Sequence, residues 1–415
     1  MWKLKTKILP RLMASLLLFC LSDLALAHGE RAQQAGLRTR TIQWFDTEVY
    51  PRNAKINEIV TVKGRFIPSK WWPKHMAQPD GLEGAAYLNV GVPGPVFVRV
   101  DSRVNGVPMI RSTTFEKGRE YEYEIKLKAR RPGKYHVHPV ISIRDAGPII
   151  GPAYWVEVTG DPADFENKIE TLTGQVIDLE TWGMDNTIFW HTCWFLVFVA
   201  WIGYWFRKLP VLMPRYKKVM VLGEDADQLI EFKDMVVGAV FFVFILTAIG
   251  GSYLWAQNEY PITIPLQTGE VEVIPLPEPP VIAEVKVNKA RYRIPGRSFK
   301  LDLTVTNHGD SPIQVGAFYI GGIRFMNPKI ITGAIKEEKG DLIAPDGLTV
   351  NTPPIQPGET RDIVVFADDA LWETYRLTSL IYDPDSRFAG LLMFYDEEGN
   401  RYIKEIGGGM VPVFT

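Results

Sequence analysis

Two long apolar segments in the middle of the chain constrain its fold more than any other feature. One covers roughly residues 187–206 and the other roughly residues 235–256. Each holds about 20 mostly apolar residues, enough to cross a hydrocarbon core of about 30 Å as a helix. A buried helix pair in a soluble core is the alternative, but the aromatic residues at the segment ends favour a membrane.

The charges that flank these segments predict their orientation. Residues 171–186 contain no Lys or Arg, and the next cation after the second segment is Lys286. The positive-inside rule therefore predicts a cytoplasmic loop between two transmembrane helices, with both large outer segments on the opposite side. The cations of the loop are Arg207, Lys208, Arg215, Lys217, Lys218 and Lys233.

The N-terminus supports the same orientation independently. A cationic start is followed by an apolar run over residues 12–26 and by the small-residue pattern Ala25-Leu26-Ala27. This pattern is typical of a secretory signal peptide over residues 1–27. Cleavage after Ala27 would leave a mature chain of about 390 residues that begins with His28.

Composition narrows the class of protein. A net charge of -2 gives no support for a nucleic-acid partner. The two cysteines are Cys20, removed with the signal peptide, and Cys193, inside an apolar segment. The mature chain therefore cannot form an internal disulfide, and its outer domains contain no thiolate ligand for a metal.

Both outer segments have the pattern of β-sandwiches. Short stretches of strand composition, such as residues 59–66, 121–127 and 363–366, alternate with Gly/Pro turns. A Pro-rich connector at residues 275–280 is expected to be extended. The fold class expected is mainly β with two transmembrane helices. The expected domains are 1–27 (signal peptide), 28–183 (periplasmic N-terminal domain), 184–260 (helices and cytoplasmic loop) and 261–415 (periplasmic C-terminal domain).

Three histidines form the candidate metal site. His136 and His138 lie two positions apart after a Pro-Gly turn, so a strand would place both imidazoles on one face. A mature N-terminal His28 would add an imidazole and a free α-amine. Nitrogen-only ligation suits copper, and less exclusively zinc or nickel. The alternative is a solvated histidine pair on a strand surface.

The remaining polar candidates favour structural roles. His191 lies near the outer end of the first apolar segment, where a bond to a neighbouring helix is the simpler interpretation. His75 lies in a Trp-rich surface loop, and His308 in a predicted turn. Asp383 and Asp385 are expected to organise a loop. A blue-copper carrier is excluded because such a site needs a Cys ligand.

The chain resembles the B (beta) subunit of the copper membrane monooxygenases, the family of particulate methane monooxygenase and ammonia monooxygenase. The resemblance covers nearly the whole mature chain. Its motifs, in order, are residues 28–30 (His-Gly-Glu), 40–44 (Arg-Thr-Ile-Gln-Trp), 88–91 (Leu-Asn-Val-Gly), 93–97 (Pro-Gly-Pro-Val-Phe), 129–133 (Ala-Arg-Arg-Pro-Gly), 136–138 (His-Val-His), 147–152 (Gly-Pro-Ile-Ile-Gly-Pro), 172–174 (Leu-Thr-Gly), 260–267 (Tyr-Pro-Ile-Thr-Ile-Pro-Leu-Gln) and 381–392 (Ile-Tyr-Asp-Pro-Asp-Ser-Arg-Phe-Ala-Gly-Leu-Leu).

The resemblance implies two periplasmic cupredoxin-like β-sandwich domains joined by a transmembrane helical hairpin. It implies a complex with A and C subunits, arranged as a trimer of heterotrimers in the lipid of a bacterial cell or intracytoplasmic membrane. It also implies that His28, His136 and His138 bind copper, with Glu30 beside them. A second copper site of some members needs histidines where this chain has Gln43 and Ile67, so that site is not expected.

The function implied is O₂-dependent hydroxylation of methane or a short alkane, with oxidation of ammonia to hydroxylamine as the alternative. The family's oxidation step is usually placed at copper in the C subunit, so no catalytic residue is assigned here. Two other classes remain open: a membrane-anchored periplasmic copper carrier or assembly factor, and a histidine-brace polysaccharide oxygenase.

Overall fold

The structure is a computed structural model that describes residues 33–80, 86–171, 173–208, 213–261, 269–294, 298–330 and 342–414. The predicted signal peptide and His28 lie outside the described residues. Contacts divide the chain into two compact units. One joins Met1–Phe165 with Gln267–Thr415, and the other is Glu166–Leu266.

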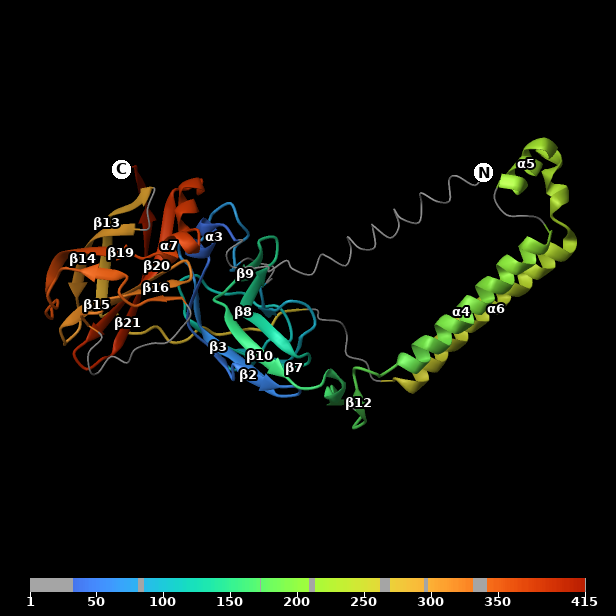
Figure 1. Cartoon of the computed structure of the whole chain (residues 1–415), viewed down its shortest axis with the longest axis horizontal. Coiled ribbons are helices and arrows are strands. Elements are labelled where there is room, and N and C mark those ends of the chain that lie inside the picture. Colours follow the sequence, from blue (N-terminus) through green and yellow to red (C-terminus); the bar gives the residue numbers. More distant parts are fainter. Residues whose placement is uncertain are drawn as a thin grey trace, which may run out of the picture. The chain divides into compact units, whose positions relative to one another are not determined.

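The first β region is built from two sheets that share one core (Figure 1). One sheet has the strand order β1-β3-β7-β5-β6, and the other has the order β2-β10-β8-β4 with β9 paired to β8. The strands are β1 (Ile42–Tyr50), β2 (Asn53–Lys55), β3 (Ile59–Pro68), β4 (Ala86–Gly91), β5 (Phe97–Val104), β6 (Val107–Pro108), β7 (Tyr121–Ala129), β8 (Gly133–Ile143), β9 (Gly147–Ile150) and β10 (Tyr154–Thr159).

Alternation along these strands explains the core. In β7, Tyr121, Tyr123 and Ile125 are buried while their neighbours are not, which is the period of a strand with one face inward. The ring of Tyr121 packs on Phe66, and that of Tyr123 packs on both Trp44 and Phe66. The strands expected at residues 59–66 and 121–127 are confirmed as parts of β3 and β7.

The second β region repeats the two-sheet plan. Its sheets have the orders β18-β19-β14-β13-β22 and β17-β16-β15-β20-β21. The turns expected at residues 307–310 and 356–359 lie where predicted, before β15 and before β19. The strands are β13 (Ala283–Ile294), β14 (Ser298–Asn307), β15 (Ile313–Ile320), β16 (Ile323–Met326), β17 (Ile343–Ala344), β18 (Leu348–Val350), β19 (Thr360–Asp368), β20 (Arg387–Asp396), β21 (Arg401–Gly409) and β22 (Val411–Phe414).

The two β regions meet along an apolar seam within one unit. Phe45 and Ile67 of the first region pack with Tyr319, Leu391 and other buried side chains of the second. The short helix α3 (Ala35–Arg40) also reaches both, since it contacts β1 and β9 as well as β20. Within the second region, the 3₁₀ helix η3 (Leu377–Tyr382) contacts α3, and the short helix α7 (Leu371–Thr374) packs on η3.

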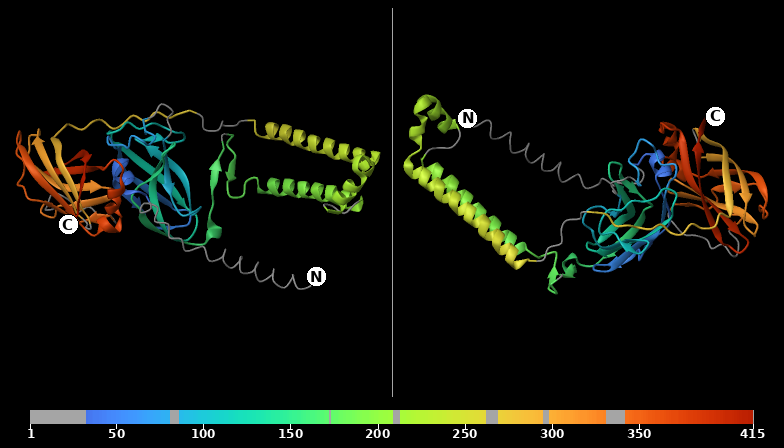
Figure 2. Two further views of the ribbon diagram at one scale, coloured as in Figure 1. Left: turned by 90° about the horizontal axis from the view of Figure 1, so that it is seen from above. Right: turned by 180° about the vertical axis from the view of Figure 1, so that it is seen from behind.

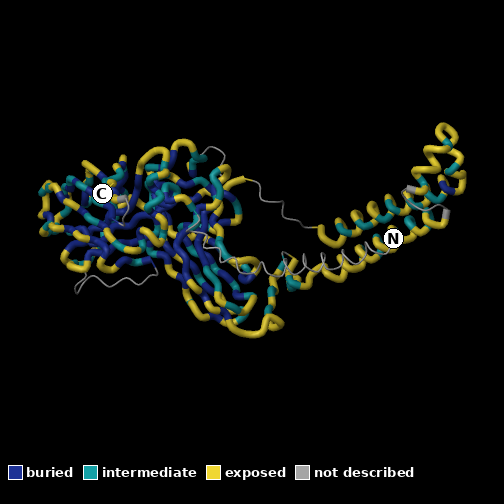
Figure 3. The backbone as a smooth tube through the Cα atoms, turned by 45° about the horizontal axis from the view of Figure 1, so that its top comes forward, coloured by how far each residue is buried: buried dark blue, intermediate teal, exposed yellow. Residues whose placement is uncertain are grey.

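The other unit contains two long helices that run side by side (Figure 2). They are α4 (Met184–Lys208) and α6 (Phe232–Glu259), and Trp201 packs on Phe241 between them at a centroid distance of 5.0 Å. Both are long and apolar enough to cross a membrane, and apart from Asp234 the residues described in them are exposed or half-buried (Figure 3). The smaller elements are η1 (Pro162–Asp164), β11 (Lys168–Glu170), β12 (Val176–Asp178), α5 (Met213–Leu222) and η2 (Gly223–Leu229).

The expected fold class is confirmed: two β regions flank two long apolar helices. Both helices extend a few residues beyond the predicted segments. The added residues are mostly polar or aromatic, so a search for apolar stretches does not include them. Helical hydrogen bonding nevertheless continues through them. The connector at residues 275–280 has no helix or strand, as expected for its proline content.

Candidate metal centre

Strand β8 places the two histidines side by side on the face opposite the core. Val137, between them, is fully buried in the core of the first β region. Because strand side chains alternate, His136 and His138 both point to the opposite face. Their ring centroids lie 4.7 Å apart, with an interplanar angle of 78°. The prediction that one strand presents both imidazoles on one face is confirmed.

A hydrogen bond fixes the tautomer of His138. Its Nδ1 lies 3.1 Å from the carbonyl oxygen of Gly151, and the residue is only 6% exposed. A carbonyl oxygen only accepts, so Nδ1 carries the hydrogen and donates it. The lone pair of the neutral ring then lies on Nε2. This is the arrangement of metal-binding histidines, whose second nitrogen donates to an oxygen acceptor.

Glycine at position 151 lets this carbonyl approach the imidazole. The Gly151 amide donates to the Pro139 carbonyl at 2.8 Å, which holds the segment after β9 against β8. A Cβ at position 151 would lie 2.7 Å from Pro139 Cγ and 2.9 Å from Trp44 Cδ2. Any side chain there would push the indole or the proline aside. A glycine at position 151 therefore lets the segment pack with its carbonyl at His138 Nδ1.

The first described residue is fastened to the same edge. Gln33 Nε2 donates to the Pro148 carbonyl at 2.5 Å, and the Ile150 amide donates to Gln33 Oε1 at 3.2 Å. Both partners belong to β9, which pairs directly with β8. The chain that leads back toward His28 therefore starts beside the histidine strand.

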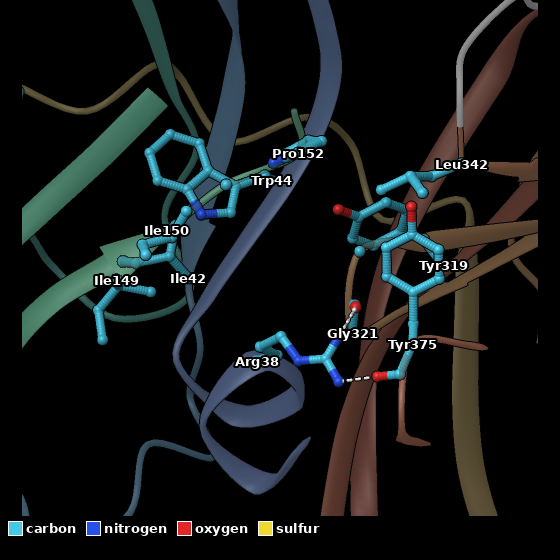
Figure 4. Close-up of a pocket in the computed structure, with 12 residues that line it drawn as sticks. Arg38, Ile42, Trp44, Ile149, Ile150, Pro152, Tyr319, Gly321, Leu342 and Tyr375 are labelled. Carbon is cyan, nitrogen blue, oxygen red and sulfur yellow. Dashed lines mark hydrogen bonds between the residues drawn. The ribbon is translucent and has the colours of Figure 1, made fainter. Parts of the chain in front are cut away.

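The seam behind this edge is closely packed (Figure 4). Arg38 of α3 donates to the carbonyl of Gly321 at 3.4 Å and to that of Tyr375. Trp44 and Ile150 line the same cavity from the first β region. The cavity has a volume of about 20 Å³, room for about one water molecule. Gly151, whose carbonyl contacts His138, also lines this cavity.

Two of the other histidines, His191 and His308, have partners within the fold. His191 Nδ1 lies 2.8 Å from the Thr187 carbonyl of its own helix, rather than bonding to a neighbouring helix. His75 is exposed in its loop. His308 lies in a turn, with Nε2 3.2 Å from Glu284 Oε2.

Some family members have a second copper site, and the two positions that correspond to its histidines lie directly opposite each other on neighbouring strands here. Gln43 of β1 lies opposite Ile67 of β3. The Gln43 amide donates to the Thr39 carbonyl, and the Ile67 side chain is apolar. These two side chains offer no imidazole. Among the described residues there is also no group of three or more His, Cys, Asp or Glu side chains placed to hold a metal. The set of His28, His136 and His138 stays a prediction, since His28 lies outside those residues.

Sequence reasoning missed two neighbours of the histidine pair, Gly151 and Trp155. Gly151 belongs to the Gly-Pro-Ile-Ile-Gly-Pro motif, which carried the family resemblance without an assigned role. Trp155 of β10 lies directly opposite His136. The sequence offered one signal for Trp155: buried and exposed residue types alternate along β10, which follows Gly151-Pro152, and this period places Trp155 on the outer face of a strand.

These features define a class: a protein with two β-sandwich regions, a pair of membrane-length helices and two adjacent histidines on the strand face opposite the core. A family model that describes the B subunit of monooxygenases matches residues 29–414. A relative, the particulate methane monooxygenase alpha subunit of Methylococcus capsulatus (strain Bath), is 45% identical over 395 residues, which are 94% of this chain and 93% of the relative. The chain belongs to the family of monooxygenase B subunits.

Solved structures give weaker likenesses. The cupredoxin domain of amoB from Nitrosocaldus yellowstonii is 17% identical with a TM-score of 0.25, covering 31% of this chain and 93% of that domain. The family assignment rests on the family model and on the relative from Methylococcus capsulatus.

Proposed function

We propose that this chain is the copper-binding B subunit of a membrane-bound monooxygenase that hydroxylates methane or a short alkane with O₂. The observation that carries this proposal is the likeness to a particulate methane monooxygenase subunit along nearly the whole chain. The histidine pair on β8 supplies a place for the metal. Two long apolar helices supply the attachment to the membrane.

The copper ligands in this proposal are His28, His136 and His138. The Nδ1 hydrogen bond of His138 leaves the lone pair on Nε2, where it can bind a metal ion, and the His136 ring lies beside the His138 ring. Gln33 lies five positions after His28, and an extended chain of five steps spans at most about 18 Å. Gln33 is held on β9, which pairs with the histidine strand β8, and this attachment supports the choice of His28 as the third ligand. Nitrogen ligands suit copper, which supplies one-electron and O₂ chemistry when bound.

The membrane arrangement follows from charge and exposure. We place residues 28–183 and 261–415 in the periplasm and the loop between α4 and α6 in the cytoplasm. The exposed apolar side chains of the two helices need lipid or partner helices around them. We propose that A and C subunits supply such partners, in a trimer of heterotrimers.

The test is copper content and activity of the purified membrane complex. His138→Ala is expected to remove the copper held by this chain, measured by elemental analysis and by electron paramagnetic resonance. His308→Ala, which changes an exposed turn histidine, is the matched control. Unchanged copper content in His138→Ala would refute the site.

Partners and substrate are tested with the same preparation. Co-purification with two other membrane subunits is expected. A stable, copper-loaded single chain without them would favour the carrier or assembly factor instead. Methane and ammonia oxidation are assayed side by side, and a rate with ammonia alone would overturn the assignment of methane.

A further inference from the structure

The indole of Trp155 lies against the imidazole of His136. The ring centroids are 4.6 Å apart, and the planes are inclined by 31°. Strand β10 pairs antiparallel with β8, and Trp155 is the direct cross-strand partner of His136. This contact is therefore set by strand register and does not depend on a loop.

Trp155 lies outside the core. Its neighbours Tyr154 and Val156 are buried in the first β region, whereas Trp155 points outward and is 39% exposed. The side chain adds nothing to the sandwich interior. Lys134, on the same face of β8, places Nζ 5.3 Å from the centroid of the indole ring. The indole thus contacts one cation and one candidate metal ligand.

We propose that Trp155 is a positioning residue that holds the His136 imidazole and stabilises its metal-bound form. The inference rests on the proposed function. An aromatic face carries negative charge density and attracts electron-poor rings and cations. A metal ion draws electron density from the imidazole that binds it. Contact with the indole is therefore stronger in the metal-bound state than in the metal-free state.

This difference separates the proposal from a purely structural role. A contact of equal strength in both states would change the stability of the fold and leave copper affinity unchanged. A contact that strengthens on ligation changes the affinity itself. Residues that support a metal ligand from behind commonly alter affinity by about 10- to 100-fold when removed.

Two variants of Trp155 and one control test the idea in the full-length mature chain, purified in detergent. Trp155→Leu keeps apolar bulk and removes the aromatic face, and Trp155→Phe keeps a smaller face. Tyr87→Leu is the control. Tyr87 is exposed on β4, which pairs with β8 on the side opposite β10, and its strand partner is Ser142.

Cu(II) affinity is measured by competition with a chelator, alongside tryptophan fluorescence and electron paramagnetic resonance. Trp155→Leu is expected to bind Cu(II) about tenfold more weakly, Trp155→Phe to recover part of the loss, and Tyr87→Leu to match the wild type. Copper should quench a component of the fluorescence that is missing from Trp155→Phe. The resonance spectrum of Trp155→Leu should differ from that of the wild type.

Two outcomes overturn the inference. One is wild-type affinity with an unchanged spectrum in Trp155→Leu. The other is a loss of affinity matched by a lower melting temperature of the metal-free protein, which marks a structural role. His138→Ala separates this failure from that of the proposed function. If it loses copper while Trp155→Leu does not, only the role of Trp155 is refuted; if it keeps copper, the site itself is refuted.

Discussion

The guanidinium of Arg40 lies 3.3 Å from the carboxylate of Asp383, a residue 343 positions later in the chain. It also lies 2.8 Å from the carboxylate of Asp385. The hydrogen bond from Arg40 lowers the pKa of Asp385 below its ordinary value. Two motifs that carry the family resemblance thus meet at one ion-pair network, which ties α3 to the loop after η3.

Arg40→Met is expected to destabilise the first unit strongly. The side chains of Arg40 and Asp383 are only 3% and 7% exposed, so removal of the cation leaves a buried carboxylate with a hydrogen bond from the Asp385 amide but without its ion-pair partner. Breaking a buried pair in this way costs about 3 kcal/mol or more. The measurement is the melting temperature of the purified chain.

A matched exposed pair is the control for this variant. Lys63 and Glu48 form a 3.2 Å contact with both side chains more than half exposed, so Lys63→Met should cost less than about 1 kcal/mol. The double variant with Arg40→Met and Asp383→Leu should regain part of the lost stability. Equal effects of Arg40→Met and Lys63→Met would contradict the role given to this network.

The Glu405 carboxyl on β21 predicts a pH dependence of stability. Burial raises its pKa above 4.5, although hydrogen bonds from Ser69 Oγ and from the Lys70 amide act in the opposite direction. The folded chain therefore binds this proton more tightly than the unfolded chain. The stabilisation from Glu405 is full below pH 4.5 and is lost as the pH rises through the higher folded-state pKa.

Glu405→Gln removes this titration. Relative to the wild type, the variant should gain melting temperature between about pH 4 and about pH 7. Glu373→Gln, at an exposed position on α7, controls for the loss of one negative charge. A constant difference between Glu405→Gln and the wild type across this range would count against the interpretation.

Much of the architecture was predictable because periodic patterns express it locally. Leu301, Leu303 and Val305 alternate with polar neighbours, and all three are fully buried in β14. The same period is enough to place His136 and His138 on one face of a strand. Helix length followed from the apolar stretches, since a membrane requires them to be continuous.

The partners of the histidine pair were not predictable, because they depend on register between strands. Trp155 lies opposite His136 only because β10 pairs with β8 in one register, and a shift of one residue would place a buried side chain there. Arg40 and Asp383 are likewise brought together by the packing of α3 on the second β region. No local pattern encodes either contact.

Gly151→Ala is expected to weaken copper binding without touching a ligand. The new Cβ would overlap Pro139 and Trp44, so these side chains or the backbone at position 151, whose carbonyl contacts His138 Nδ1, must shift. We expect a loss of about 1–3 kcal/mol in stability, typical of overpacking, and weaker Cu(II) binding. Chelator competition and thermal melting measure the two effects.

The control for Gly151→Ala is Gly408→Ala. Gly408 lies in β21, and a Cβ there would approach only Val287 Cγ1, at 3.8 Å. This variant should leave both stability and copper affinity close to wild type. Wild-type copper affinity in Gly151→Ala would contradict the prediction that crowding at position 151 weakens copper binding.

The last prediction concerns the N-terminus. The protein isolated from membranes is expected to begin at His28, because Ala25-Leu26-Ala27 is a cleavage pattern and the α-amine of His28 is a proposed ligand. Intact mass and N-terminal sequencing measure the start.

A variant with one alanine inserted after Ala27 should be cleaved to a chain with an extra residue before His28. That chain keeps the imidazole and displaces the amine, so its copper affinity should fall while its melting temperature without metal stays unchanged. A wild-type chain that starts earlier or later would remove the amine from the ligand set, and an insertion variant that binds copper as tightly as wild type would do the same.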